Sequence, residues 1–160
     1  MGTYHIAQIC KNGHVINTSA DRYPESNQDY CSKCGAPTIM RCEDCGAPIR
    51  GYYEVPGVIG FFEYERPSFC YKCGSPYPWT RSALQGAREL AQTLDGLSAG
   101  EIQELQKSLE DIVRETPRAK VAETRFKRIM KKVGSDGYEA MRDILTSIVS
   151  EAVRKSLFGI

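Results

Sequence analysis

Hydrophobic and polar positions follow two different patterns in the two halves of this 160-residue chain. From residue 80 onward, apolar residues recur every three to four positions, as they do along one face of an α-helix. Before residue 80 this period is absent, and short apolar or aromatic runs alternate with turn residues, which is typical of small β-hairpins. We therefore expect a turn-rich domain of residues 1–79 and a helical domain of residues 80–160, divided near Pro76–Thr80.

The helical half is predicted to hold about four helices. A modest helix over 83–94 comes first, and a capping box of Ser98 and Glu101 opens the second. A third helix follows Pro117, and a fourth, which has the broadest apolar stripe, runs from about 138 to 157. Short loops join these helices, so a small antiparallel bundle is expected. We assign the broad stripe to the centre of the bundle, with a dimer surface as the alternative.

All seven cysteines lie in the turn-rich half. Cys10 is followed four positions later by His14, across an Asn-Gly dipeptide that favours a tight turn. The two-residue gap of a Cys-x-x-Cys pair lets one turn present two thiolates to one ion, and a following glycine tolerates positive φ. The other six cysteines form three such pairs, each followed by glycine, a small residue and proline: Cys31/Cys34, Cys42/Cys45 and Cys70/Cys73.

Four turns of this kind predict two tetrahedral metal sites, one of three cysteines and a histidine and one of four cysteines. Zinc is the default ion for thiolate-rich sites, although an all-cysteine site also accepts iron. Disulfides are disfavoured by the odd cysteine count, by the pairing and by the lack of a secretory signal. The alternative for the Cys10/His14 turn is that His14 is a surface histidine and Cys10 an isolated buried thiol. The predicted ligands are Cys10, His14, Cys31, Cys34, Cys42, Cys45, Cys70 and Cys73.

The pairing of the four turns is not decided by loop-closure entropy, because sequential and nested pairing cost nearly the same and interleaved pairing only about 0.8 kcal/mol more. Thr38-Ile39-Met40 favours β structure and lacks turn residues, so it fits an extended link between two ribbons better than a hairpin turn. The predicted fold is therefore α+β, small and metal-stapled: two tandem zinc ribbons of short β-hairpins followed by a small antiparallel helical bundle. Sites of four protein ligands are closed, so both ions are expected to be structural.

The charge pattern disfavours a strongly basic surface that binds nucleic acid, because the chain has a net charge of only +1. Residues 1–80 carry seven basic and eight acidic side chains, and seven thiolates with two divalent ions would bring that half to about −4, which repels phosphate. Only residues 118–132 are strongly basic, with seven Lys or Arg against one Glu. We favour pairing with the acidic preceding helix, and a phosphate-binding face is the alternative.

Aromatic residues of the turn-rich half are assigned to thin ribbon cores or to a protein-binding surface, since aromatics anchor many protein interfaces. His5 is expected to be a packed or surface residue rather than a ligand or base. The aromatics concerned are Tyr52, Tyr53, Phe61, Phe62, Tyr64, Phe69, Tyr71, Tyr77 and Trp79.

The combination of motifs resembles a bacterial family of unknown function that has paired zinc ribbons and a helical tail. The resemblance rests on Cys10-Lys11-Asn12-Gly13-His14, the three Cys-x-x-Cys-Gly turns, Pro76-Tyr77-Pro78-Trp79 and the helical residues 80–160. It implies metal binding and a bacterial cytoplasmic origin, and it brings no known activity.

These observations predict a non-enzymatic, structural zinc-binding protein that acts as an adaptor for a protein partner, with a homo-oligomer through the C-terminal helices as a further option. The alternative is a nucleic-acid-binding protein that uses the basic helix 118–132. An enzyme using Glu54, Glu63 and Glu65 is a third option, but the chain lacks a nucleophile–base motif and a phosphate-cradling glycine loop. No run of about 18 apolar residues is present, so no membrane partner is expected and the location is expected to be cytoplasmic.

Overall fold

A computed structural model describes residues 1–60 and 62–160 of the chain. The chain divides into two compact units, a ribbon unit of Met1–Thr80 and a helical unit of Arg81–Ile160. The fold class predicted from the sequence is confirmed: small antiparallel sheets with two cysteine clusters precede a set of packed helices. Across the described residues, no helix combines the length and apolar character needed to cross a membrane.

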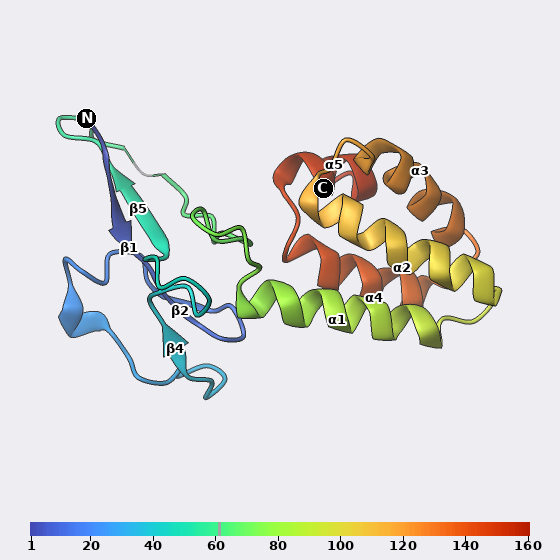
Figure 1. Cartoon of the computed structure of the whole chain (residues 1–160), viewed down its shortest axis with the longest axis horizontal. Coiled ribbons are helices and arrows are strands. Elements are labelled where there is room, and N and C mark those ends of the chain that lie inside the picture. Colours follow the sequence, from blue (N-terminus) through green and yellow to red (C-terminus); the bar gives the residue numbers. More distant parts are fainter. Residues whose placement is uncertain (61) are drawn as a thin grey trace. The chain divides into compact units, whose positions relative to one another are not determined.

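Two small antiparallel sheets form the ribbon unit (Figure 1). In the first, β1 pairs with β5 and places Tyr4 opposite Tyr53. In the second, β2 lies between β3 and β4. The extended strand expected after the second cysteine turn is β4, which places Thr38 opposite Cys10. The strands are β1 (Thr3–Ile6), β2 (Gln8–Cys10), β3 (Val15–Asn17), β4 (Thr38–Ile39) and β5 (Arg50–Glu54).

The hydrophobic core of the ribbon unit is thin and includes cysteines. Ile9 and Ile49 are fully buried beside the stacked rings of Tyr77 and Trp79, whose centroids are 4.8 Å apart. Cys42 and Cys70, which belong to two of the Cys-x-x-Cys pairs, are part of the same buried core. A core of this size rarely holds a small domain together alone, so the cysteine clusters are a structural part of the unit.

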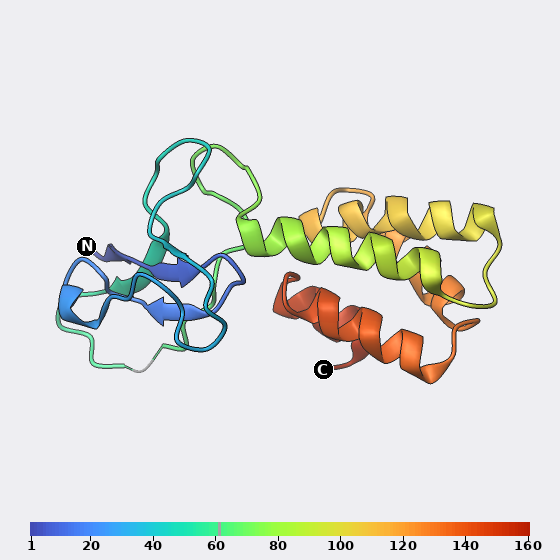
Figure 2. The ribbon, with the colours of Figure 1, turned by 90° about the horizontal axis from the view of Figure 1, so that it is seen from below.

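The helical unit contains a tightly packed antiparallel pair, α2 and α3, whose facing side chains are among the most deeply buried of the chain (Figure 1). Figure 2 shows α1, in green, and α4, in orange-red, lying side by side in the same unit. The capping box at the start of α2 is confirmed, since the Ser98 side chain accepts from the Glu101 amide and the Glu101 carboxylate accepts from the Ser98 amide. The helices are α1 (Pro78–Thr93), α2 (Ala99–Arg114), α3 (Ala119–Met130), α4 (Ser135–Thr146) and α5 (Glu151–Phe158).

The prediction of a single last helix from about 138 to 157 is wrong. The structure has two helices here, α4 and α5, separated by residues 147–150. Ser150 begins the second one with extended backbone and a side chain that accepts from the Val153 amide at 3.3 Å, which is the geometry of an N-cap. The apolar stripe continues across the break, and for that reason the pattern did not reveal it.

The start of α4 also differs from the prediction, which began the last helix at about residue 138. Gly137 lies inside the first turn of α4. A Cβ atom at this position would lie 2.7 Å from the Leu94 side chain and 2.8 Å from the Val133 side chain, so the glycine permits close packing rather than ending a helix.

Candidate metal centres

Three Cys-x-x-Cys-Gly turns of the ribbon unit share one backbone geometry. In the turn that begins at Cys31, the Gly35 amide donates to the Cys31 carbonyl at 2.8 Å, and the Cys31 amide donates to the Ala36 carbonyl at 2.8 Å. Both bonds recur with the same spacing in the turns that begin at Cys42 and Cys70. The glycine has positive φ in all three, a conformation that other residues adopt only with strain. The geometry that brings each pair of thiols together is therefore set by bonds within its own turn.

The remaining cysteine turn, which is the first along the chain, joins Cys10 to His14. Its backbone closes through the Gly13 amide, which donates to the Cys10 carbonyl at 2.8 Å, and the His14 amide donates to the Cys10 sulfur at 3.3 Å. Gly13 has a φ of +94°. Strand β2 ends at Cys10, so this turn places the first thiol at the end of the central strand of its sheet.

All eight predicted ligands lie in two compact groups, and the grouping is sequential. The first and second turns form one group and the third and fourth form the other, with the potential ligand atoms of each group all within 4.8 Å of one another. The first group is Cys10, His14, Cys31 and Cys34; the second is Cys42, Cys45, Cys70 and Cys73.

The distances within each group fit tetrahedral coordination. In the first group the Cys10 sulfur is 3.7 Å from the Cys34 sulfur and 3.4 Å from the His14 Nδ1. In the second group the Cys45 and Cys70 sulfurs are 3.6 Å apart. Zinc bonds of about 2.3 Å to sulfur and about 2.0 Å to nitrogen, arranged as a tetrahedron, require about 3.8 Å between sulfurs and about 3.5 Å between sulfur and nitrogen. Both sets of residues can therefore hold one ion each.

Amide donors stabilise negative charge in the first group. Hydrogen bonds from the Ala36 amide and the Asn12 side chain, whose nitrogen is 3.3 Å from the sulfur, lower the pKa of Cys34 to about 6. Burial raises the pKa of Cys10. The Cys34 thiol therefore loses its proton more readily than an ordinary cysteine does. A bound cation would favour deprotonation of the other thiols of this group as well.

The second group shows the same asymmetry. Although burial opposes it, the amides of Cys73 and Lys72 lower the pKa of Cys70 to about 6. For Cys45, a hydrogen bond from the Ala47 amide is outweighed by burial and by the neighbouring thiols, which together raise its pKa to about 11. Four thiols packed around one point cannot all ionise without a cation at the centre.

Arg66 supports the first group from outside, a role that its position in the sequence did not signal. Its guanidinium donates to the Gly13 carbonyl at 2.5 Å and lies 5.5 Å from the centre of the Trp79 ring. Burial lowers the pKa of Arg66, and the nearby charge of Cys10 opposes that shift. Three thiolates, a neutral imidazole and a divalent ion carry a net −1, which a neighbouring arginine compensates.

His5 lies outside both groups. Its ring nitrogens are 3.1 Å from the Asp21 carboxylate and 3.0 Å from the Glu54 carboxylate. Hydrogen bonding to Glu54, and then to Asp21, raises the pKa of His5. Glu54 also accepts from Arg22 at 2.6 Å, so it belongs to an ion-pair cluster that ties β1 and β5 to the loop after β3.

Basic residues of the 118–132 segment face the acidic helix α2. Glu104 is 3.4 Å from Arg125 and 3.0 Å from Arg128, and Glu101 is 2.6 Å from Lys132. This is the mutual pairing that the sequence pattern favoured, and it neutralises part of the charge that a phosphate-binding face would need.

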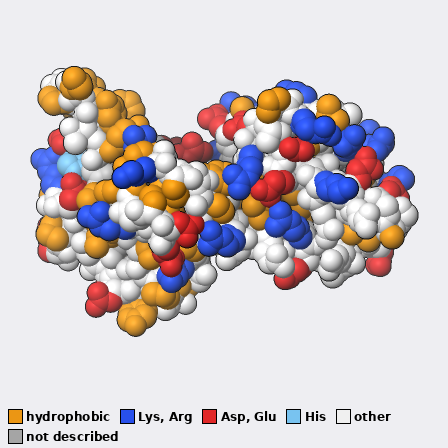
Figure 3. Space-filling view, in the orientation of Figure 1, with side chains coloured by type: hydrophobic (Ala, Val, Ile, Leu, Met, Phe, Trp, Pro, Cys, Tyr) orange, Lys and Arg blue, Asp and Glu red, His pale blue; other side chains and the backbone are white. Residues whose placement is uncertain are grey.

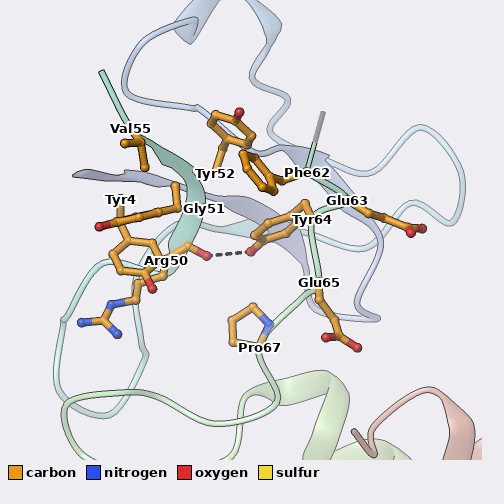
Figure 4. Close-up of a pocket in the computed structure, with 11 residues that line it drawn as sticks. Tyr4, Arg50, Gly51, Tyr52, Val55, Phe62, Glu63, Tyr64, Glu65 and Pro67 are labelled. Carbon is orange, nitrogen blue, oxygen red and sulfur yellow. Dashed lines mark hydrogen bonds between the residues drawn. The ribbon is translucent and has the colours of Figure 1, made fainter. Parts of the chain in front are cut away.

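A second candidate site is an apolar groove beside β5, which we call the aromatic groove (Figure 4). Its volume is about 580 Å³. The rings of Tyr52, Phe62 and Tyr64 stand on one side and that of Tyr4 on the other, with Gly51 between them. The described residues that line it are Tyr4, Arg50, Gly51, Tyr52, Tyr53, Val55, Phe62, Glu63, Tyr64, Glu65 and Pro67.

Aromatic residues of the ribbon unit divide between its buried core and its surface. Tyr77 and Trp79 fill the core, whereas Tyr4, Tyr53 and Phe62 remain 48%, 43% and 61% exposed at the groove. Phe61, which was also considered, lies outside the described residues. Hydrophobic side chains gather at the end of the ribbon unit that carries the N-terminus and the loop after β5 (Figure 3). The position of the groove could not be read from the sequence, because it depends on how residues 62–67 fold back along β5.

A family model described as "Uncharacterized protein conserved in bacteria (DUF2321)" matches residues 3–157. The chain therefore belongs to this bacterial family, which agrees with the resemblance seen in its motifs. No curated protein and no solved structure matches the chain.

Proposed function

We propose that this member of the DUF2321 family is a non-enzymatic zinc protein whose ribbon unit binds a protein partner. Zinc is supported by the donor sets, three thiolates with an imidazole and four thiolates, and by distances that suit its tetrahedral radius. With four protein donors each, neither site keeps a ligand position for water or substrate, so the ions stabilise the fold rather than catalyse a reaction.

The observation that carries the adaptor role is the aromatic groove. Tyr4, Tyr53 and Phe62 each expose about half of their surface around this one groove, although aromatic side chains are the residues that gain most from burial. An exposed apolar patch with a polar surround typically marks a site of protein interaction. Tyr is enriched among the residues that dominate the binding energy of protein interfaces. Contacts in this groove would therefore contribute most of the binding free energy with a partner.

The experiment is affinity capture with the zinc-loaded chain as bait. Wild type is compared with Phe62→Ser, which removes one exposed ring of the groove, and with Tyr30→Ser, which removes a ring that is 66% exposed outside it. We expect at least one protein to be retained by wild type and Tyr30→Ser and lost by Phe62→Ser. Identical sets of captured proteins for all three baits would refute a partner site at the groove.

A further inference from the structure

We infer that the aromatic groove binds a proline-containing peptide segment that also carries Lys or Arg. This inference rests on the proposed adaptor function and names the chemistry of its partner. Three features of the groove lead to it: a strand edge that is partly hydrogen-bonded, two tyrosine hydroxyls that bond to none of the described residues, and acidic side chains on one flank.

Two backbone groups on the outer edge of β5 are already hydrogen-bonded, which works against one common mode of peptide binding. The Tyr52 amide donates to the Thr18 carbonyl at 2.8 Å. The Arg50 carbonyl accepts from the Tyr64 hydroxyl at 2.7 Å, a bond drawn in Figure 4. On its other edge β5 pairs with β1. A peptide that adds a strand to a sheet needs free backbone groups along an edge, so these two bonds favour recognition through side chains.

Polyproline II segments suit a groove of this kind. Such segments have no internal hydrogen bonds, keep their carbonyl groups free, and dock into grooves lined by aromatic rings at low entropic cost. Tyr4 and Tyr53 both line the groove, and within residues 1–60 and 62–160 their hydroxyls have no hydrogen-bond partner. These two hydroxyls can donate to the carbonyl groups of a bound segment while the rings contact its prolines.

The acidic side chains beside the groove favour a bound segment that carries positive charge. Glu63 and Glu65 are exposed on the segment that forms one wall, and their carboxylates point away from the rings in Figure 4. Arg50, the one basic residue of the lining, has its guanidinium 4.5 Å from the centre of the Tyr4 ring and 3.9 Å from that of Tyr71, so stacking holds its charge at one side. A Lys or Arg that leaves the groove past Glu63 meets an acidic flank, on a unit whose zinc-loaded charge is about −4.

The first test is selection of a displayed random peptide library on the zinc-loaded full chain, with Phe62→Ser and Tyr30→Ser as matched variants. We expect enrichment of peptides that combine proline with Lys or Arg, retained by Tyr30→Ser and lost by Phe62→Ser. Enrichment of proline-free or acidic peptides overturns the inference but leaves the adaptor function standing. An empty selection also overturns it, and the adaptor function then depends on the separate capture experiment.

The second test measures the binding of one selected peptide, fluorescently labelled, by anisotropy. Phe62→Ser should weaken it about tenfold or more, since truncation of an aromatic anchor removes a dominant contact. Glu63→Lys should weaken it several-fold, whereas the matched Glu25→Lys, which reverses an exposed charge outside the groove lining, should have little effect. Equal effects of the two reversals would show that only the overall charge matters and would overturn the role of the acidic flank.

Discussion

The guanidinium of Arg66 donates to the carbonyl of Gly13 across 53 residues of sequence. The contact links the turn that holds Cys10 and His14 to the segment between the two cysteine turns of the second group, Cys42/Cys45 and Cys70/Cys73. A Cβ atom at Gly13 would lie 2.1 Å from the Arg66 Nη1 and 2.9 Å from the Trp79 Cβ. The first turn is therefore shaped both by its own sequence and by an arginine far from it in the chain.

We predict that Gly13→Ala destabilises the ribbon unit more than Gly35→Ala does. Both glycines have positive φ, so each substitution costs about 1–2 kcal/mol of backbone strain. Only Gly13 also meets a side chain, because nothing lies within 4 Å of a Cβ at Gly35. Thermal unfolding followed by the fluorescence of Trp79, the one tryptophan of the chain, measures the difference.

A double-mutant cycle serves as the control for that prediction. Combining Gly13→Ala with Arg66→Ala should recover part of the loss, since the shortened side chain no longer occupies the space of the new methyl group. Strictly additive effects of the two substitutions would show that the contact does not couple the residues.

Chelation of zinc should unfold the ribbon unit and leave the helical unit folded. Structural zinc contributes about 10–16 kcal/mol of binding free energy in small zinc domains, which is folding free energy when no site exists in the unfolded chain. The helical unit has its own buried core, which includes Leu105, Leu109, Phe126 and Met141. With a strong chelator, the fluorescence of Trp79 should change while most helical circular dichroism persists. Loss of both signals in one transition would instead indicate a single cooperative unit.

The ion-pair cluster formed by His5, Asp21, Arg22 and Glu54 should stabilise the ribbon unit most in mildly acidic solution. Because the pKa of His5 is raised, its contribution is complete below its unfolded value of about 6.5 and is lost as pH rises through the folded value. The pKa of Glu54 is lowered by its hydrogen bonds to His5 and Arg22, so its contribution is present above about pH 4.5 and is lost as pH falls through the folded value. Between these limits both groups are charged in the folded protein.

The stability difference between wild type and His5→Gln measures this contribution, since the effect of pH on the metal sites is common to both proteins. We expect a larger difference near pH 6 than near pH 8.5, given an unperturbed histidine pKa of about 6.5. A difference that does not vary with pH would mean that the imidazole is not charged in the folded state.

Gly137→Ala should fail to stabilise α4, although alanine usually favours a helix over glycine by about 1 kcal/mol. The new methyl group would meet the side chains of Leu94 and Val133 at less than 3 Å, so these must shift. Gly86 in α1 provides the matched control, because nothing lies within 4 Å of a Cβ there. Denaturant unfolding should show a gain for Gly86→Ala and no gain, or a loss, for Gly137→Ala.

The sequence predicted the parts of this protein that local geometry decides. A Cys-x-x-Cys-Gly turn needs only its own backbone to bring two sulfurs together, and Ser98 with Glu101 caps α2 within one helical turn. The sequential grouping of the turns followed from the β preference of residues 38–40, which form the edge strand β4 and its end.

Features that depend on contacts between distant segments could not be predicted. The break at Ser150 is hidden under a continuous apolar stripe, and the hydrogen bond from Arg66 to Gly13 has no local signature. The aromatic groove likewise forms only when Tyr64 reaches the Arg50 carbonyl from a segment 14 residues further along the chain.

Native mass spectrometry of the full chain, purified without added metal and compared with its denatured mass, measures the number of ions that each polypeptide retains. We predict two zinc ions per chain, reduced to one by Cys31→Ser in the first group or by Cys42→Ser in the second. A chain that is folded with fewer than two ions, or that is lighter by the mass of cysteine hydrogens lost to disulfides, would contradict a ribbon unit built around two metal centres.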